Sequence, residues 1–240
     1  MVIKRHILGW ALIYAIVLSG FWAIFVFGSK VVATMNQGEF PIKRGCVIID
    51  AGHGGVDGGT TSCTGIAESH LNLEISLRLN DFLHFIGIDT KMIRTTDCSV
   101  YTSGETIAAK KVSDLKERVR MVETTENAIL VSVHQNFFGQ SIYSGAQVFY
   151  GKNTEGQNIA RDLQKNLINT VNPGSKRSAK KASGVYLMEH VTCPAILIEC
   201  GFLSNPQEEA LLRSEAYQKR LCCVIGNTLS EFLNSSSSIT

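Results

Sequence analysis

Residues 46–55 of this 240-residue chain have the sequence CVIIDAGHGG, an apolar run that ends in polar residues and glycines. A short continuous apolar run before a glycine-rich loop is typical of a strand that is buried on both faces. Such strands occur in largely parallel sheets that helices cover on both sides. The segment therefore predicts an α/β fold with a glycine-rich loop at the carboxyl end of its first strand.

Strand-like and helix-like segments alternate along the rest of the chain. A helix is expected to begin near Glu68, because apolar residues from Leu71 to Ile86 recur at helical spacing. The polar stretches 95–112 and 172–183 are expected to be loops. The other expected strands are 89–94, 128–133, 146–150 and 195–198, and the other expected helices are 116–126, 157–170, 206–212 and 215–233.

This alternation predicts a single three-layer domain over residues 46–234, with a twisted, largely parallel sheet flanked by helices. A chain of 240 residues has room for one domain with a full core, and the sequence contains no internal repeats. The serine-rich residues 235–240 are expected to form a flexible tail.

The N-terminal region has a different composition from the body. Residues 7–27 carry no charged side chain, and a run of about 20 such residues can cross a bilayer as one helix. Lys4 and Arg5 precede the run, which predicts a cytoplasmic N-terminus and an exported, membrane-held body. We therefore expect a signal anchor over residues 1–28 and a tether over residues 29–45. A cleaved signal peptide, which would release the body, is the alternative, although the run is long and lacks a small-residue cleavage site.

The charge distribution argues against a nucleic-acid partner. The whole chain has 23 basic and 21 acidic residues, and residues 46–240 have 18 basic and 20 acidic ones. A body with this slightly acidic balance lacks the electrostatic footprint of a nucleic-acid-binding protein. The composition also excludes a collagen, a long disordered chain and a polytopic membrane protein. Seven cysteines, an odd number, exclude a fully paired set of disulfides.

Four side chains are expected at the carboxyl edge of the sheet, where ligand sites of α/β folds lie. His53 follows the first strand, and His134 and Glu199 stand at the ends of two later strands. Glu68 lies on the core-facing side of the first helix, so its carboxylate needs a partner or a metal ion. Two histidines and a carboxylate form a catalytic zinc site, beside which a second carboxylate can act as general base. The wide spacing of these residues carries no specificity of its own.

Other interpretations of these residues stay open from the sequence pattern. His53 and His134 could be hydrogen-bonded core histidines, and Cys63 could form a nucleophile pair with His53. Asp50 could orient a ligand histidine or could cap the loop. A dinucleotide-binding loop is disfavoured, because Asp57 occupies the third glycine position of that motif.

Four segments resemble, in order, the motifs of the zinc-dependent N-acetylmuramoyl-L-alanine amidases. They are VIIDAGHGG (47–55), GIAE (65–68), SVHQN (132–136) and IECGFLSN (198–205), and the resemblance covers residues 46–233. It implies an α/β domain that binds one Zn²⁺ ion through His53, Glu68 and His134, with Glu199 as the catalytic carboxylate. The implied reaction hydrolyses the amide between the lactyl group of N-acetylmuramic acid and L-alanine of the peptidoglycan stem peptide. Phe137 departs from the pattern, since many relatives have small residues after the asparagine.

Within this family, the chain resembles amidases of the spore cortex. The resemblance rests on the single anchor, the bare catalytic domain and the stretches KVSDL (111–115), YSGAQVFY (143–150) and CPA (193–195). It implies that the enzyme acts with a deacetylase to form the muramic-δ-lactam that permits germination, and that a lipoprotein activator is a candidate partner. The alternatives are a vegetative cell-wall amidase, another zinc hydrolase of the cell wall, and a catalytically silent peptidoglycan-binding module.

Two further residues are candidate substrate contacts. Arg177 lies in a basic loop, and stem peptides carry carboxylates, so charge and family position both make Arg177 a candidate. Asn136, two residues after His134, is the second candidate.

Overall fold

The computed structural model describes residues 18, 22 and 45–236. The predicted anchor (1–28) and tether (29–45) therefore lie almost entirely outside the described residues. Within the described part, no helix is long and apolar enough to cross a membrane. Residues 45–236 belong to one compact unit, an α/β domain.

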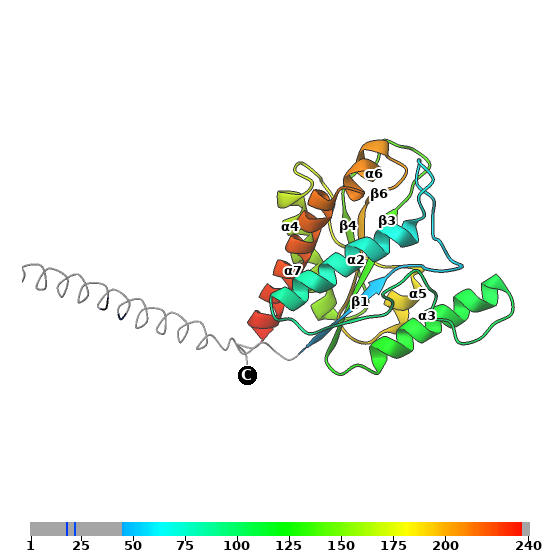
Figure 1. Ribbon diagram of the computed structural model, residues 1–240, viewed down its shortest axis with the longest axis horizontal. Coiled ribbons are helices and arrows are strands. Elements are labelled where there is room, and N and C mark those ends of the chain that lie inside the picture. Colours follow the sequence, from blue (N-terminus) through cyan, green and yellow to red (C-terminus); the bar gives the residue numbers. More distant parts are fainter. Residues whose placement is uncertain (1–17, 19–21, 23–44, 237–240) are drawn as a thin grey trace, which may run out of the picture. The chain divides into compact units, whose positions relative to one another are not determined.

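A mixed sheet forms the centre of the domain (Figure 1). Among the described residues it has six strands in the order β2-β1-β3-β6-β4-β5. Each neighbouring pair is parallel except β6 and β4, which are antiparallel, so the sheet is parallel for the most part, as predicted. The strands are β1 (Cys46–Ala51), β2 (Thr90–Met92), β3 (Ala128–Asn136), β4 (Gln147–Tyr150), β5 (Lys180–Lys181) and β6 (Ala195–Phe202).

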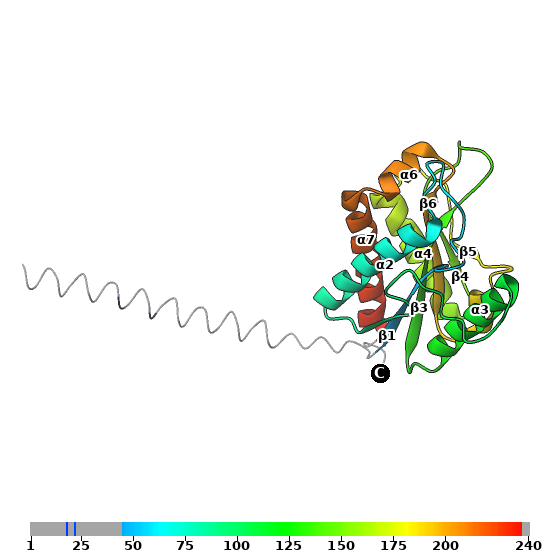
Figure 2. The same cartoon turned by 45° about the vertical axis from the view of Figure 1, so that its right-hand side comes forward.

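Helices cover both faces of the sheet and complete three layers (Figure 2). On one face, α7 packs against both α2 and α4, and on the other face α3 packs against α5. The short α6 follows β6 and contacts it. The helices are α2 (Glu68–Phe85), α3 (Ile107–Glu123), α4 (Thr154–Thr170), α5 (Tyr186–His190), α6 (Pro206–Leu212) and α7 (Glu215–Ser236).

The central strands form because their apolar residues are buried on both faces of the sheet. Ile48 of β1 and Leu130 of β3 pack with Val122 of α3 and Met188 of α5. On the opposite side, the helical stripe of α2 that includes Leu79 is buried as its periodicity predicts. This double burial fixes the carboxyl ends of β1, β3 and β6 side by side, which positions the site.

Some boundaries differ from the prediction. α3 begins at Ile107, well before residue 116, because the Thr106 side chain caps it by accepting a hydrogen bond from the Ala109 N–H (3.2 Å). The two-residue β5 and the short α5 were not expected, since neither has enough residues to show a periodicity. The last helix, α7, continues to Ser236 and so extends two residues into the predicted tail.

Candidate metal centre

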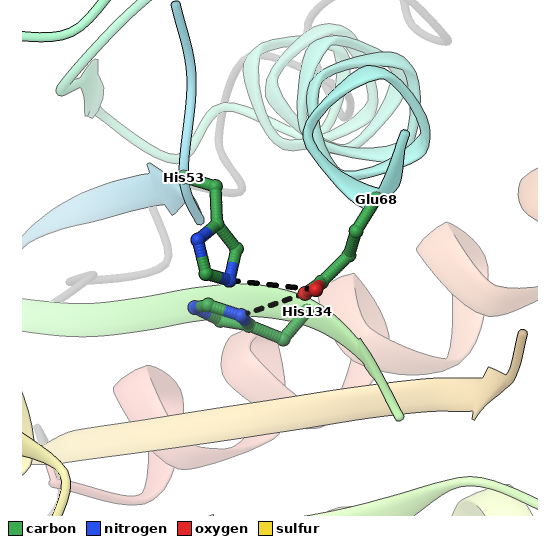
Figure 3. Close-up of side chains that lie close together, drawn as sticks. All are labelled: His53, Glu68 and His134. Atoms are coloured by element: carbon green, nitrogen blue, oxygen red, sulfur yellow. Dashed lines mark hydrogen bonds and ion pairs between the residues drawn. The ribbon is translucent and has the colours of Figure 1, made fainter. Parts of the chain in front are cut away.

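Three side chains from separate elements meet at the carboxyl edge of the sheet (Figure 3). His53 lies in the loop after β1, Glu68 is the first residue of α2, and His134 lies near the end of β3. One potential ligand atom from each lies within 4.8 Å of the others. The structure thus brings the three predicted metal ligands together, and the described residues contain no second cluster of this kind.

Glu68 is surrounded by hydrogen-bond donors. Its Oε1 atom pairs with His134 Nδ1 (3.0 Å) and accepts from Asn72 Nδ2 (3.2 Å) and the Gln135 N–H (3.2 Å). Its Oε2 atom accepts from the Thr60 N–H (3.1 Å). Burial acts to raise the pKa of Glu68, but the neighbouring histidines and the Thr60 N–H lower it to about 2. The carboxylate is therefore ionised at neutral pH, as a metal ligand must be.

His53 is held through both its ring and its backbone. Its Nδ1 atom pairs with Asp57 at 2.9 Å, and Asp57 also forms an ion pair with Lys111 at 3.1 Å. The other ring nitrogen, Nε2, lies 3.4 Å from Glu68. The φ angle of His53 is +61°, a left-handed conformation that costs about 1–2 kcal/mol in a residue with a Cβ atom. Arg118 donates to the His53 carbonyl at 2.8 Å and so stabilises this backbone conformation.

Two glycines leave the space that the ligands occupy. A Cβ atom on Gly52 would lie 2.2 Å from His134 Nε2. A Cβ atom on Gly59 would lie 2.7 Å from Glu68 Oε2, and the φ angle of Gly59 is +71°. A side chain at either position would displace a candidate ligand, so Gly52 and Gly59 are required by the packing of these three side chains.

Asp50 supports the site indirectly. It forms a buried ion pair with Arg118 of α3, and Ser132 donates to its other oxygen at 2.6 Å. Burial opposes ionisation of Asp50, but the Arg118 charge holds the pKa of this carboxyl below its ordinary range. Arg118 also donates to the His53 carbonyl, so Asp50 helps to hold the backbone of the loop after β1 by fixing the Arg118 side chain. The sequence left open whether Asp50 orients a ligand histidine or caps the loop, and in the structure its contact with the loop runs through Arg118.

A second buried arginine, Arg94, holds the same loop. Its guanidinium donates to the carbonyls of Ala51 (2.8 Å), Gly52 (3.1 Å) and Ser69 (2.8 Å). The planar, multiply donating guanidinium suits such a junction of carbonyl groups. Neither arginine could be recognised from the sequence, because an isolated arginine in a polar segment carries no clear sign that its side chain is buried. For Arg118, the one available signal is its position four residues before the buried Val122 on the same helix.

Glu199 lies beside His134, its partner in register on the adjacent strand β6. Its Oε2 atom is buried and has no hydrogen-bond partner among the described residues. Burial raises the pKa of Glu199 to about 7; the His134 charge opposes this shift and the Glu68 charge adds to it. A carboxylate with a pKa near neutrality and a free oxygen can exchange protons with a bound molecule. Glu199 is therefore placed to act as a proton acceptor.

The two candidate substrate contacts lie near the end of β6. Asn136 is half-buried and its carbonyl accepts from the Leu203 N–H at 2.8 Å. Arg177 donates to the Ser144 carbonyl at 3.0 and 3.1 Å, and its guanidinium lies 4.9 Å from the Phe202 ring. Phe202 is the register partner of Asn136, so both candidates adjoin one end of the sheet. Arg177 also holds a loop, which the sequence did not show.

Other candidate groups have different partners. Cys63 donates to Glu209 at 3.1 Å, and this carboxylate raises the pKa of the Cys63 thiol, which disfavours a nucleophilic role. All seven cysteines are unpaired. The remaining described histidines, His70, His84 and His190, pair with Asp97, Thr90 and the Tyr186 carbonyl respectively.

The donor set fits a divalent metal ion. Two imidazoles and one ionised carboxylate converge from three elements, and glycines keep the space between them open. These are ligand types that Zn²⁺ takes in catalytic sites, where one coordination position stays free. The neighbouring Glu199 oxygen without a partner is the polar group that such a site leaves available for chemistry.

Comparison with known proteins identifies the family. A family model described as N-acetylmuramoyl-L-alanine amidase matches residues 47–231. The germination-specific N-acetylmuramoyl-L-alanine amidase of Bacillus subtilis (strain 168) is 36% identical over 193 residues, which cover 78% of this chain and 79% of that protein.

Solved structures share the fold. The CwlD amidase from Clostridioides difficile, in complex with the GerS lipoprotein, is 33% identical with a TM-score of 0.76, and the match covers 80% of this chain and 99% of that one. The catalytic domain of CwlV, an N-acetylmuramoyl-L-alanine amidase from Bacillus (Paenibacillus) polymyxa var. colistinus, is 27% identical with a TM-score of 0.66, over 79% of this chain and 98% of that one. The chain therefore belongs to the N-acetylmuramoyl-L-alanine amidase family, within which it resembles CwlD.

Proposed function

We propose that this protein is a zinc-dependent hydrolase of the amide between the lactyl group of N-acetylmuramic acid and L-alanine of the stem peptide. One observation carries the proposal: the cluster of His53, Glu68 and His134 lies beside the unpartnered oxygen of Glu199. Two sets of groups are thereby available, one for a metal ion and one for a proton. Membership of the amidase family supports the identity of the bond.

The residues of the site divide the reaction between them. A Zn²⁺ ion held by His53, Glu68 and His134 would supply a Lewis acid for the scissile carbonyl and would lower the pKa of water. Glu199 accepts a proton from the attacking water while the oxygen of that water forms a bond to the carbonyl carbon. Glu199 then donates this proton to the nitrogen of L-alanine as the C–N bond breaks. The buried Oε2 atom of Glu199, which has no hydrogen-bond partner among the described residues, is available for both transfers.

The products of wild-type protein with zinc on purified peptidoglycan test this proposal. We expect new L-alanine amino termini and, by mass analysis, glycan that keeps its acetyl groups and lactyl carboxylates. His53→Ala is the control, and we expect it to lose both bound zinc and activity. Peptidase or deacetylase products would identify a different zinc hydrolase. Binding to peptidoglycan without any product would indicate a silent binding module.

We further propose that the reaction serves the spore cortex. The name of the Bacillus subtilis relative and the similarity to CwlD support this role. Removal of the stem peptide frees the lactyl carboxylate, which can close to the muramic-δ-lactam once a deacetylase has freed the amino group. Muropeptides of cortex made with and without the protein test the role: we expect the lactam to disappear without it. An unchanged cortex with an altered vegetative wall would favour a vegetative amidase.

We also propose that this protein is anchored in the membrane with its body outside the cytoplasm, and that a lipoprotein activates it. The uncharged run 7–27 supports the anchor, and the complex of CwlD with the GerS lipoprotein supports the partner. Fractionation of cells, followed by protease treatment from outside, should find the body in the membrane fraction and accessible. A shorter protein in the medium would instead show that the segment is a cleaved signal peptide.

A further inference from the structure

The segment 60–67 forms a hairpin between the glycine loop and α2. Across the hairpin, the Ser62 N–H donates to the Ile66 carbonyl at 2.8 Å. At its base, the Thr60 N–H donates to Glu68 Oε2 at 3.1 Å, and the Thr60 carbonyl accepts from the Glu68 N–H at 2.8 Å. The base of the hairpin therefore contacts a candidate metal ligand directly.

Glu209 of α6 holds the tip of this hairpin. Its carboxylate accepts hydrogen bonds from Ser62 Oγ (2.9 Å), the Cys63 thiol (3.1 Å) and the Thr64 hydroxyl. The Cys63 N–H also donates to the Leu203 carbonyl at 3.2 Å. Three consecutive residues of the hairpin thus donate to one carboxylate that lies some 145 residues further along the chain.

Apolar packing cannot fix the hairpin tip, because Thr61, Cys63, Thr64 and Gly65 are exposed. By contrast, Glu209 is only 2% exposed. A buried carboxylate is costly unless donors satisfy it, so the hairpin and α6 depend on each other. The three side-chain hydrogen bonds to Glu209 and the backbone bond from Cys63 to Leu203 therefore hold the position of the tip.

We propose that Glu209 is a positioning residue for the metal centre. By fixing the hairpin tip, it keeps the Thr60 N–H against Glu68 and so keeps the ligand carboxylate in place. This inference rests on the proposed zinc site but not on the proposed substrate. The adjacent Glu208 provides an internal contrast, because its carboxylate accepts from the N–H groups of Gly145 (2.8 Å) and Phe202 (3.1 Å) and so holds different backbone.

Glu209→Gln tests the proposal, because the amide keeps the shape but replaces one acceptor oxygen with a donor. We expect the dissociation constant for Zn²⁺, measured by chelator competition in the absence of substrate, to rise about tenfold. Amide hydrogen exchange of residues 60–68 in the metal-free protein should accelerate. Activity should fall at limiting zinc and return to the wild-type value in excess zinc, because the ligands themselves are intact. Glu208→Gln is the matched control, and its zinc affinity should stay within twofold of wild type.

A second variant removes two of the donors instead of the acceptor. Cys63→Ala combined with Thr64→Val leaves α6 and the hydrogen bonds that Ser62 Oγ accepts within the hairpin unaltered, and it should weaken zinc binding in the same direction. Combined with Glu209→Gln, its effect should be much less than additive, since both changes break the same contact. If Glu209→Gln fails to fold, this double variant decides the question.

Three results would overturn the proposal: unchanged zinc affinity in the folded variants, an equal loss in Glu208→Gln, or activity that excess zinc does not restore. The proposed function can fail separately. Wild-type protein that binds zinc but releases no L-alanine termini would contradict the amidase proposal and leave the role of Glu209 standing.

Discussion

Glu68 and Glu199 are the same side chain on two walls of one site, formed by α2 and β6, and they differ in the hydrogen-bond donors that surround them. Glu68, on the α2 wall, is satisfied at both oxygens, and its pKa is lowered to about 2. Glu199, on the β6 wall, has one oxygen without a partner, and burial raises its pKa to about 7. The comparison shows that the supply of donors separates a carboxylate suited to a metal ion from one suited to a proton.

The largest expected effect comes from exchanging each carboxylate for its amide. Glu199→Gln keeps the size of the side chain but cannot accept a proton, so we expect kcat to fall about 10³-fold, within the range for loss of a general base. Its zinc affinity should stay within threefold of wild type. Glu68→Gln should instead lose zinc, because an amide is a much weaker ligand than an ionised carboxylate.

Turnover on peptidoglycan and metal content after dialysis measure the two outcomes separately. Asp162→Asn, an exposed change on α4, serves as the control and should alter neither quantity. If Glu199→Gln released zinc as readily as Glu68→Gln, the division of roles between the two walls would be wrong.

The sequence predicted the parts of this contrast that depend on local pattern. β1, β3 and β6 are continuous apolar runs, and their carboxyl ends had to share an edge in a parallel sheet, so His53, His134 and Glu199 could be placed together. The motif resemblance then assigned their roles. The inward position of Glu68 followed from helical spacing alone.

The buried charged residues that hold the loops around the site could not be predicted in the same way. Arg94, Arg118 and Glu209 support the site through contacts that span between 25 and 147 residues of sequence, and a local pattern does not show such distant partners. The start of α3 was missed for a related reason, since a threonine cap decides it within a polar stretch. Short elements such as β5 exist because a neighbouring strand offers a partner.

The second expected effect concerns the support behind the His53 loop. Arg118→Met leaves Asp50 as a buried carboxylate without its cation, so we expect the free energy of unfolding to fall by about 3 kcal/mol at pH 7. Urea unfolding of the metal-free protein measures this loss. Adding Asp50→Asn should recover part of it, because the uncompensated charge is then gone.

Arg120→Met on the same helix is the control for this effect. Arg120 is exposed and pairs with Glu117 of its own helix, so its removal should cost much less stability than the removal of Arg118. Equal losses for the two arginine variants would show that the buried pair does not support the loop more than a surface pair does.

A third, smaller effect should appear in the pH dependence of metal-free stability, with opposite signs for the two walls. The pKa of Glu199 is raised, so ionisation penalises the folded state increasingly as the pH rises from about 4.5 to about 7. Glu199→Gln should therefore stabilise the metal-free protein on the order of 2 kcal/mol at pH 8 and very little at pH 4.5. The pKa of Glu68 is lowered, so its ionised form stabilises the fold above about pH 4.5, and this contribution is lost as the pH falls toward 2.

Glu68→Gln should accordingly destabilise the metal-free protein at pH 8. Denaturant unfolding in the presence of a chelator, at pH 4.5 and pH 8, gives both comparisons with the same two variants. Shifts of the same sign at pH 8 would mean that the two carboxylates do not have opposed environments.

The smallest expected effect lies beside the β6 wall, at Arg177. Its guanidinium contacts the Phe202 ring and the Ser144 carbonyl, so it can both present charge to a stem-peptide carboxylate and hold a loop. Arg177→Ala should raise KM about fivefold, which corresponds to roughly 1 kcal/mol, and should leave zinc affinity unchanged.

Arg177→Lys separates the two roles, because lysine keeps the charge but cannot reproduce the flat stacking and paired donors. A KM near wild type in the lysine variant would assign Arg177 to substrate binding, whereas a rise equal to that of alanine would assign it to the loop. An unchanged KM in Arg177→Ala would show that Arg177 does not bind substrate, and Glu199 would then be the only proposed functional residue on the β6 wall.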